Sequence, residues 1–337
     1  MGAVTPPPLP VLADLLDGLH VVALPMRVPF RGVTVREAAL VQGPAGWGEF
    51  APFTEYAPAE AARWLAAAVE AAWQGWPAPV RDTVPVNATV PAVGAADVAG
   101  VLARFPGCTT AKVKVAERGQ SLRDDLERVA AVREALGPQG RVRVDANGAW
   151  DVDQARAALR ALAAYGLEYA EQPCASVADL RALRLALARD GVDVPVAADE
   201  SIRKAEDPLR VAREEAADLV VVKVAPLGGV RRALEVVAEC GLPAVVSSAL
   251  DTSVGMAAGA ALAGALPDLP HACGLGTVAL LEGDVARDPL VPDGGALPVR
   301  RVDADPDLLR RWEATPERQA WWRERVAACR ALLAAGA

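Results

Sequence analysis

Five short apolar runs in this chain each end in a charged side chain, and they recur at nearly even steps. The runs AKVKV, RVRVD, EYAE, PVAAD and LVVVK end at or beside Lys114, Asp145, Glu171, Asp199 and Lys223, and a sixth run, PAVVSS, ends at Ser247 and Ser248. The successive steps from Lys114 to Ser247 are 31, 26, 28, 24 and 24 residues. One strand–loop–helix–loop unit needs roughly 25–30 residues. As parallel strands of one sheet, these runs would bring their charged ends to a single edge.

From about residue 84 the pattern alternates between strand and helix. Stretches with helical spacing follow the N-cap candidates Ser121, Asp151 and Ser176. Eight strands are expected, at 85–90, 111–115, 141–145, 167–171, 194–199, 219–224, 243–247 and 272–276. This number of alternating units predicts a (β/α)8 barrel of the modified TIM type. A doubly wound open sheet is the alternative, although no glycine-rich dinucleotide motif or P-loop follows any strand.

The segments on either side of the repeats have patterns of their own. The first 80 residues are expected to form a small α+β domain of two strands, an aromatic loop (GWGEFAPFTEY) and one amphipathic helix at 59–73. Its boundary is expected at the Trp-Pro-Ala-Pro stretch. The barrel is expected over residues 81–300. The tail at about 300–337 has a helix that starts at Thr315 and Pro316. Trp312, Trp321 and Trp322 are expected to pack this tail against the rest of the protein.

Composition excludes several classes of function. The net charge is −8 and the pI is about 5.0, which argues against nucleic acid or an anionic membrane as a partner. Five scattered cysteines and two histidines argue against a disulfide framework and a two-histidine zinc site. No signal peptide or membrane span is expected. These features indicate a cytoplasmic protein with a small-molecule partner, and they contain no signal for its oligomeric state.

Three carboxylates end consecutive strands of the predicted barrel. Side chains alternate across a strand, so Lys112 and Lys114 share a face, and Arg143 shares one with Asp145. We interpret this face as the inside of the barrel, because outward lysines would be buried under helices; the alternative places them on a solvated edge. Asp145, Glu171 and Asp199 would then repel one another unless a divalent cation lay between them. Their oxygen ligands suit Mg²⁺, with Mn²⁺ as an alternative.

Other interpretations of these residues remain open at this stage. Asp199 precedes Glu200 and Ser201, so it would also serve as the N-cap of a helix. Arg143 would either orient a substrate or neutralise a buried carboxylate. Lys114 and Lys223 are expected on opposite sides of the ion, where burial and neighbouring cations lower a lysine pKa and make the amine a base. The reaction class that fits is proton removal next to a carboxylate.

These motifs, in this order and spacing, resemble those of the enolase superfamily, muconate-lactonising subgroup. The resemblance covers AKVKV, VDANGAW, EYAEQP, ADES and VVVKVAPLGG and extends to a capping domain over residues 1–80. Four further segments narrow the resemblance to members of the subgroup that act in menaquinone biosynthesis: SSALDTSVG, LPHACGLGTVALLEGDV, FRG and GWGEFAPF. The resemblance then implies dehydration of 2-succinyl-6-hydroxy-2,4-cyclohexadiene-1-carboxylate to 2-succinylbenzoate, by a carbon–oxygen lyase.

The resemblance also implies roles for individual residues. Lys114 would remove the α-proton and return it to the departing hydroxyl, and Lys223 would stabilise the enediolate from the opposite face. Mg²⁺ would bind the metal ligands Asp145, Glu171 and Asp199. The substrate-binding candidates are Lys112, Arg143, Asn147, Ser247 and Ser248. Gly46–Tyr56 is expected to contribute to closure over the ligand.

Two rival functions are compatible with the sequence. An N-succinylamino acid racemase or dipeptide epimerase would use the same two lysines, but the GLGT segment and the absence of a DxD-type motif in the last barrel loop speak against an epimerase. A barrel that binds a ligand without turnover is the other rival, and the complete set of catalytic positions speaks against it.

Overall fold

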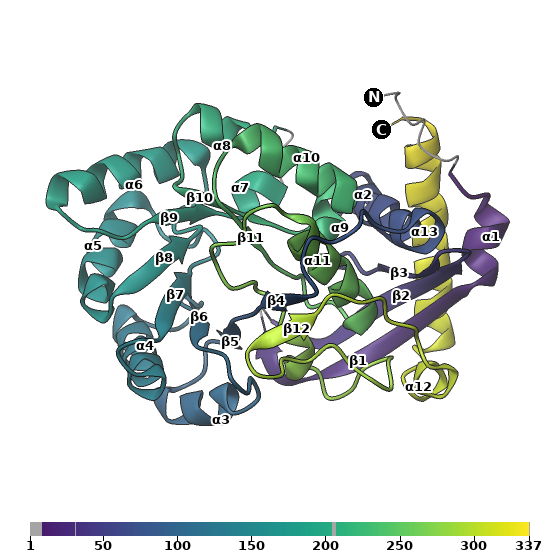
Figure 1. The fold of residues 1–337 in the computed structure, drawn as a ribbon, viewed down its shortest axis with the longest axis horizontal. Coiled ribbons are helices and arrows are strands. Elements are labelled where there is room, and N and C mark those ends of the chain that lie inside the picture. Colours follow the sequence, from purple (N-terminus) through teal and green to yellow (C-terminus); the bar gives the residue numbers. More distant parts are fainter. Residues whose placement is uncertain (1–8, 31, 204–206, 337) are drawn as a thin grey trace.

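The structure, a computed structural model, describes residues 9–30, 32–203 and 207–336. Its centre is a curled, parallel seven-stranded sheet in the order β11-β10-β9-β8-β7-β6-β5 (Figure 1). The strands are β5 (Ala88–Val90), β6 (Thr110–Lys114), β7 (Arg141–Asp145), β8 (Leu167–Glu171), β9 (Val196–Ala198), β10 (Leu219–Val222) and β11 (Ala244–Val246). Their order follows the chain, as expected when each strand is joined to its neighbour by a helix on the outside.

The expected eighth strand closes the ring without forming a regular strand. In the segment 272–276, Cys273 forms a parallel bridge with Val86, and Gly274 forms one with Ser247. The Cys273 N–H donates to Pro85 and the Gly274 N–H donates to Val246, so this segment joins the two edges of the sheet. The chain therefore forms a (β/α)8-type barrel whose last member is two bridges long.

The expected strand at 85–90 is also divided. Its first part belongs to β4 (Thr83–Pro85), which pairs with β12 (Ala296–Pro298) in a separate two-stranded sheet. The rest enters the barrel, through the Val86 bridge and β5.

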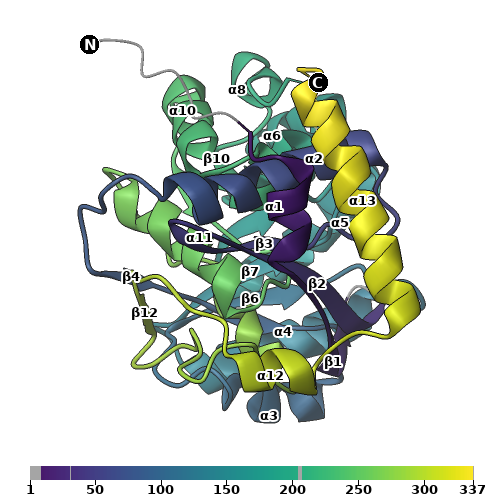
Figure 2. The same ribbon diagram turned by 90° about the vertical axis from the view of Figure 1, so that its right-hand side faces the viewer.

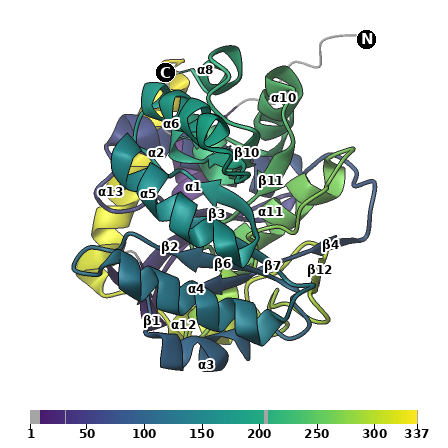
Figure 3. The same cartoon turned by 90° about the vertical axis from the view of Figure 1, so that its left-hand side faces the viewer.

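Helices cover the outer face of the sheet (Figure 3). Ser121, Asp151 and Ser176 occupy the N-cap positions of α4, α5 and α6, as predicted. The barrel helices are α3 (Val98–Leu102), α4 (Leu122–Leu136), α5 (Val152–Leu162), α6 (Val177–Asp190), α7 (Glu200–Arg203), α8 (Arg210–Arg213), α9 (Val224–Leu227), α10 (Val230–Cys240) and α11 (Ser253–Ala265). Short 3₁₀ segments are η2 (Ala95–Asp97), η3 (Ala163–Tyr165) and η4 (Thr277–Leu280).

An N-terminal unit lies against one side of the barrel mouth. Its antiparallel sheet consists of β1 (Leu19–Phe30), β2 (Val33–Gly43) and β3 (Gly46–Phe50), followed by α2 (Pro58–Val69) and the π-helical turn η1 (Glu70–Gln74). The single helix expected at 59–73 thus changes its hydrogen-bond pattern after Val69. Arg31, which lies between β1 and β2 in the sequence and belongs to the expected PFRG turn, is outside the described residues. The domain boundary near residue 80 stays a prediction.

The C-terminal tail packs back onto this unit (Figure 2). After α12 (Pro306–Arg311), α13 (Pro316–Ala334) begins at the predicted N-cap Thr315 and contacts α1 (Leu12–Asp17), α2 and β1. The Trp322 indole is fully buried, contacts Phe50 edge-on and donates to Glu37 at 2.7 Å. Trp322 therefore has the packing role that the sequence predicts.

Buried side chains follow the predicted alternation across the strands. One continuous core includes the outward-facing Val220 and Val222 of β10 and extends into the N-terminal unit. The intervening residues belong to a second, smaller cluster inside the barrel, formed by Tyr169, Ala197, Leu219, Val221 and Val245. The inside of the barrel is thus filled below the mouth, and the polar groups lie at one end. Within the described residues, no helix combines the length and apolar character needed to span a membrane.

Candidate active site

The charged strand ends converge at the mouth of the barrel, as the spacing predicts. Lys114, Asp145 and Glu171 are the last residues of β6, β7 and β8, and in the sheet register Asp145 lies opposite both of the others. Asp199 and Lys223 directly follow β9 and β10. Because β7, β8 and β9 lie between β6 and β10, the two lysines flank the three carboxylates.

Every carboxylate of this cluster contacts a cation. Lys114 Nζ lies 2.6 Å from Asp145 Oδ2, and Lys223 Nζ lies 2.6 Å from Asp199 Oδ2. Lys112 Nζ lies between Asp145 Oδ2, at 3.0 Å, and Glu171 Oε1, at 2.8 Å. All these side chains are more than nine-tenths buried. Ion pairs at this depth are little screened by solvent, so their geometry strongly affects protonation.

The two aspartates are held in the ionised form. Burial alone would raise the pKa of Asp145, but the charges of Lys114 and Lys112 outweigh it and hold this pKa well below its usual range. Burial likewise raises the pKa of Asp199, and the charges of Lys223 and Arg203 reverse the effect. Asp199 uses its side chain for these contacts, which does not support the helix N-cap alternative.

Glu171 differs from the aspartates. Burial and the negative charge of Asp145 raise its pKa to about 7, despite the opposing charge of Lys112. The charge of Asp199 raises this pKa further. The cluster is therefore short of positive charge at Glu171, and an added cation would relieve the repulsion.

The donor chemistry fits a divalent cation. Three buried carboxylates on consecutive strands supply the oxygen ligands that Mg²⁺ and Mn²⁺ prefer. In the present side-chain arrangement, no group of three Asp, Glu, His or Cys within the described ranges forms a coordination shell. The reason is visible in the ion pairs, since the lysines and Arg203 take up carboxylate oxygens that a metal would need.

A cavity opens above these groups and is bounded by both parts of the protein. Its lining combines charged and hydroxyl groups with aromatic side chains, a mixture found in sites for small molecules. Of the residues named from the sequence, seven line it: Lys112, Lys114, Asp145, Asn147, Lys223, Ser247 and Ser248. Phe30, Phe53 and Trp64 from the N-terminal unit form the opposite wall.

Asn147 is turned toward the proposed base. Its backbone adopts φ +48°, a left-handed conformation that asparagine tolerates better than most residues. Its Oδ1 accepts from Lys114 Nζ at 2.7 Å, and its Nδ2 donates to Glu200 at 3.2 Å. Asn147 thus holds the lysine amine directly, and its contact with substrate stays a prediction.

Arg143 lies deeper in the barrel than the cavity. It donates to Glu168, to Asn87 Oδ1 at 3.1 Å and to the Ala272 carbonyl at 2.7 Å. These contacts tie β7 and β8 to the segment that closes the ring. The structure therefore favours the role of partner to a carboxylate, and that carboxylate is Glu168.

The Arg143–Glu168 pair makes a testable contribution to stability. Burial raises the pKa of Glu168, but the hydrogen bond from His271 and the charge of Arg143 outweigh it and lower this pKa to about 2. Replacing Glu168 by Gln is expected to cost roughly 2 kcal/mol of unfolding free energy near neutral pH. A group with a lowered pKa stabilises above its unfolded value and loses this effect as the pH falls. Urea titrations should therefore show a smaller difference at about pH 3.5 than at pH 7; an equal difference would contradict the assignment.

Arg203 is the site residue that the sequence analysis missed. It is buried, lines the cavity, lies 3.1 Å from Asp199 Oδ1 and donates to the Tyr56 hydroxyl at 3.1 Å. Arg203 is the last residue of α7 and follows Asp199 by four residues, about one helical turn, and this spacing was the available signal. Thr89 and Thr277 also line the cavity.

Comparison with known proteins agrees with this geometry. Residues 95–304 match the sequence model "Enolase C-terminal domain-like", and residues 21–72 match "Enolase N-terminal domain-like". Among solved structures, muconate lactonizing enzyme from Pseudomonas fluorescens, complexed with muconolactone, has a TM-score of 0.74 at 23% identity and covers 88% of this chain and 98% of its own. N-succinyl Arg/Lys racemase from Bacillus cereus has a TM-score of 0.73 at 19% identity, covering 88% and 97%. At these identities the likeness shows the fold alone, a barrel with an N-terminal capping domain.

Curated relatives are far more similar in sequence. An o-succinylbenzoate synthase from Thermobifida fusca is 63% identical over 92% of this chain and 95% of its own length. An o-succinylbenzoate synthase from Mycolicibacterium smegmatis is 61% identical over 96% and 99%. This chain belongs to the o-succinylbenzoate synthase family of the enolase superfamily. Members of the superfamily pair a lysine or histidine base with divalent metal.

Proposed function

We propose that this chain is a Mg²⁺-dependent carbon–oxygen lyase that dehydrates 2-succinyl-6-hydroxy-2,4-cyclohexadiene-1-carboxylate to 2-succinylbenzoate in menaquinone biosynthesis. The observation that carries the proposal is that Lys114 and Lys223, which both line the cavity, flank three buried carboxylates at the mouth of the barrel. The o-succinylbenzoate synthases at 61–63% identity support the choice of reaction.

The reaction needs one base, one acid and a stabilised carboxylate. Lys114 removes the proton on the ring carbon that bears the carboxylate, and Asn147 Oδ1 and Asp145 Oδ2 hold its amine toward the cavity. The same lysine then donates the proton to the hydroxyl that leaves from the neighbouring ring carbon. One C–H bond and one C–O bond break, the ring gains a C=C bond and becomes aromatic, and water departs.

Lys223 and the three carboxylates are proposed to act on the charge that develops during the reaction. Negative charge develops on the substrate carboxylate as the proton leaves, and we propose that the Lys223 ammonium stabilises it from the other face; its position across the carboxylates from Lys114 supports this role. Asp145, Glu171 and Asp199 would hold Mg²⁺, which supplies Lewis-acid stabilisation to the same carboxylate. Lys112, Ser247 and Ser248 line the cavity and are proposed to bind substrate. Arg143 supports the barrel below them.

The cellular setting is part of the proposal. All five cysteines are free, and four of them are buried, as in proteins of reducing compartments. Together with the acidic charge and the small-molecule cavity, this supports a cytoplasmic enzyme without a nucleic-acid or membrane partner.

The decisive experiment compares two reactions of the purified protein with Mg²⁺. We expect rapid dehydration of the cyclohexadiene carboxylate, followed by its absorbance, and much slower exchange of the α-proton of N-succinyl amino acids in D₂O, followed by NMR. A racemase would show the reverse order of rates, and faster α-proton exchange would overturn the assignment. The likeness to the Bacillus racemase extends to the fold alone and does not favour that alternative.

A further inference from the structure

Two carboxylates of the N-terminal unit cap helices of the barrel. Glu49 of β3 accepts from the Thr252 N–H at 3.1 Å, the Thr252 hydroxyl at 2.5 Å and the Gly255 N–H at 3.0 Å, at the start of α11. Glu70 of η1 accepts from the N–H groups of Val230 and Arg231 at the start of α10. Carboxylates are favoured there because the first amides of a helix lack partners within it.

Glycines make room for both contacts. A Cβ atom on Gly255 would lie 2.9 Å from Glu49 Oε2, and one on Gly229 would lie 2.5 Å from Glu70 Oε2. Both glutamates are more than nine-tenths buried. Both contacts are buried and both join the N-terminal unit to the barrel. They differ in two respects: Glu70 also accepts from the Arg231 guanidinium at 2.9 Å, and Gly229 adopts φ +136°, whereas Gly255 lies within α11.

The two helix starts differ in what precedes them. The segment Ser247–Leu250, between β11 and α11, contributes all four of its residues to the wall of the active-site cavity. Before α10 the wall contains the separate residues Lys223 and Pro226, and Pro226 lies four residues before Val230. Glu49 thus accepts from Thr252, two residues after the continuous cavity-lining segment Ser247–Leu250, whereas the nearest cavity-lining residue before the Glu70 contact is four residues away.

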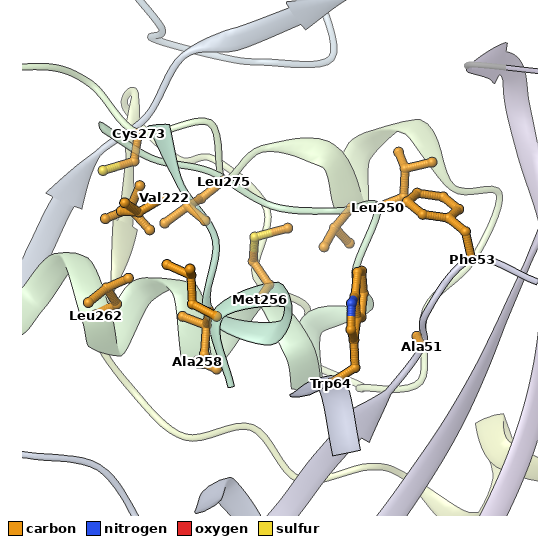
Figure 4. Close-up of a cluster of buried hydrophobic side chains, with 14 of the residues drawn as sticks. Ala51, Phe53, Trp64, Val222, Leu250, Met256, Ala258, Leu262, Cys273 and Leu275 are labelled. Atoms are coloured by element: carbon orange, nitrogen blue, oxygen red, sulfur yellow. The ribbon is translucent and has the colours of Figure 1, made fainter. Parts of the chain in front are cut away.

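A second contact from the N-terminal unit fixes the same segment. Arg36 of β2 donates to the carbonyls of Leu250, at 3.1 Å, and Ala249, at 3.2 Å. Leu250 adopts φ +62°, a conformation that costs a leucine energy and persists only where its surroundings impose it. Figure 4 shows its side chain in the buried cluster with Phe53 and Trp64, which line the cavity with it.

We propose that Glu49 is a positioning residue for substrate binding: with Arg36, it holds Ser247–Leu250 in the conformation that forms the cavity wall. The N-terminal unit thereby shapes the substrate site through the barrel's own loop, as well as through Phe30, Phe53 and Trp64. The inference rests on the proposed function, because it concerns binding of that substrate. Its alternative is a cap that supports the fold alone, as we assign to Glu70.

The test compares Glu49→Ala with the matched control Glu70→Ala. Both variants lose a buried cap, so both are expected to lower the melting temperature. Glu49→Ala should also raise KM for the cyclohexadiene carboxylate and weaken 2-succinylbenzoate binding by about tenfold or more, with a smaller change in kcat. Glu70→Ala should leave KM and product affinity within about twofold of wild type. Calorimetry with 2-succinylbenzoate measures the affinity.

The conservative variant Glu49→Gln distinguishes a role in positioning the segment from a role in stability alone. Burial and the charge of Asp251 raise the pKa of Glu49 to about 8, so neutral glutamine resembles this side chain near pH 7. Glu49→Gln should restore most of the product affinity that Glu49→Ala loses. If Glu49→Ala does not fold, Arg36→Met provides the second test, with the same expected rise in KM. Equal KM values for the Glu49 and Glu70 variants would overturn the inference.

Hydrogen exchange tests positioning without turnover. Amides of residues 247–252 should exchange faster in Glu49→Ala than in wild type and remain unchanged in Glu70→Ala. Unchanged exchange in both variants would refute the positioning role. If wild type fails to dehydrate the substrate, the proposed function fails, whereas the exchange comparison still decides whether Glu49 holds the segment.

Discussion

Replacing Lys114 by methionine is expected to lower kcat at least about 10³-fold, because a general base contributes 10²–10⁴-fold and this lysine also serves as the acid. Methionine keeps most of the volume and removes the amine. The Lys112 Nζ atom, 3.0 Å from Asp145 Oδ2, still neutralises the aspartate, so the barrel should remain folded. Stopped-flow dehydration rates and circular dichroism measure the two effects.

The Lys114→Arg variant separates charge from proton transfer. Arginine retains a cation for Asp145 but stays protonated at all accessible pH values, so it cannot accept the substrate proton. It should be as inactive as Lys114→Met, yet closer to wild type in stability. Substantial turnover by the arginine variant would show that Lys114 acts as a charge and not as a base.

The use of lysine across the whole chain supports this distinction. Of the 35 lysines and arginines, four are lysines. Lys112, Lys114 and Lys223 lie in the candidate site, and the fourth, Lys204, is outside the described residues. Arginine provides the cations elsewhere, including the exposed ion pairs. Lysine is thus found where an amine that can lose its proton would be useful.

The sequence predicts the strand-end part of the site well because two local rules determine it. Side chains alternate along a strand, and one βα unit has a narrow range of lengths, so Asp145 and Glu171 had to share a face and an edge. Their register in the sheet agrees with this. The closing segment at 272–276 was harder to predict, because two bridges are sufficient when both neighbouring edges are already fixed.

Contacts between distant segments could not be predicted in the same way. Phe30 lies 5.2 Å from Lys114 Nζ, and Arg36 reaches a carbonyl 214 positions away. No periodicity encodes such packing, since it depends on how the N-terminal unit is placed on the barrel. Arg143 shows the same limit of sequence-based prediction. The face of the strand that it occupies was predictable, but its partner Glu168 was not.

Removal of the metal is expected to abolish activity, and Glu171→Gln is expected to weaken Mg²⁺ binding at least about 100-fold. Loss of an outer partner of a metal ligand typically costs 10–100-fold, and loss of a charged ligand should cost more. EDTA should stop dehydration by the wild-type enzyme, and added Mg²⁺ should restore it. Titration calorimetry, or electron paramagnetic resonance with Mn²⁺, measures binding directly without reference to turnover.

Glu168→Gln is the matched control because it makes the same change three residues earlier on β8. Glu168 bonds to Arg143 and His271, away from the three carboxylates, so this variant should lose stability and keep its Mg²⁺ affinity. The glutamine at position 171, by contrast, removes a carboxylate whose pKa is raised to about 7 by burial and by the negative charge of Asp145. Because Lys112 keeps its second partner, Asp145, at 3.0 Å, the Glu171→Gln protein without metal should be stabilised or unchanged.

The two variants should therefore change in opposite directions. Glu171→Gln should lose metal affinity and retain stability, and Glu168→Gln should lose stability and retain metal affinity. If Glu171→Gln bound Mg²⁺ as tightly as wild type, the three carboxylates would not be the metal ligands. Their repulsion would then be balanced by Lys112, Lys114, Lys223 and Arg203 alone, as in the ion pairs of the present structure.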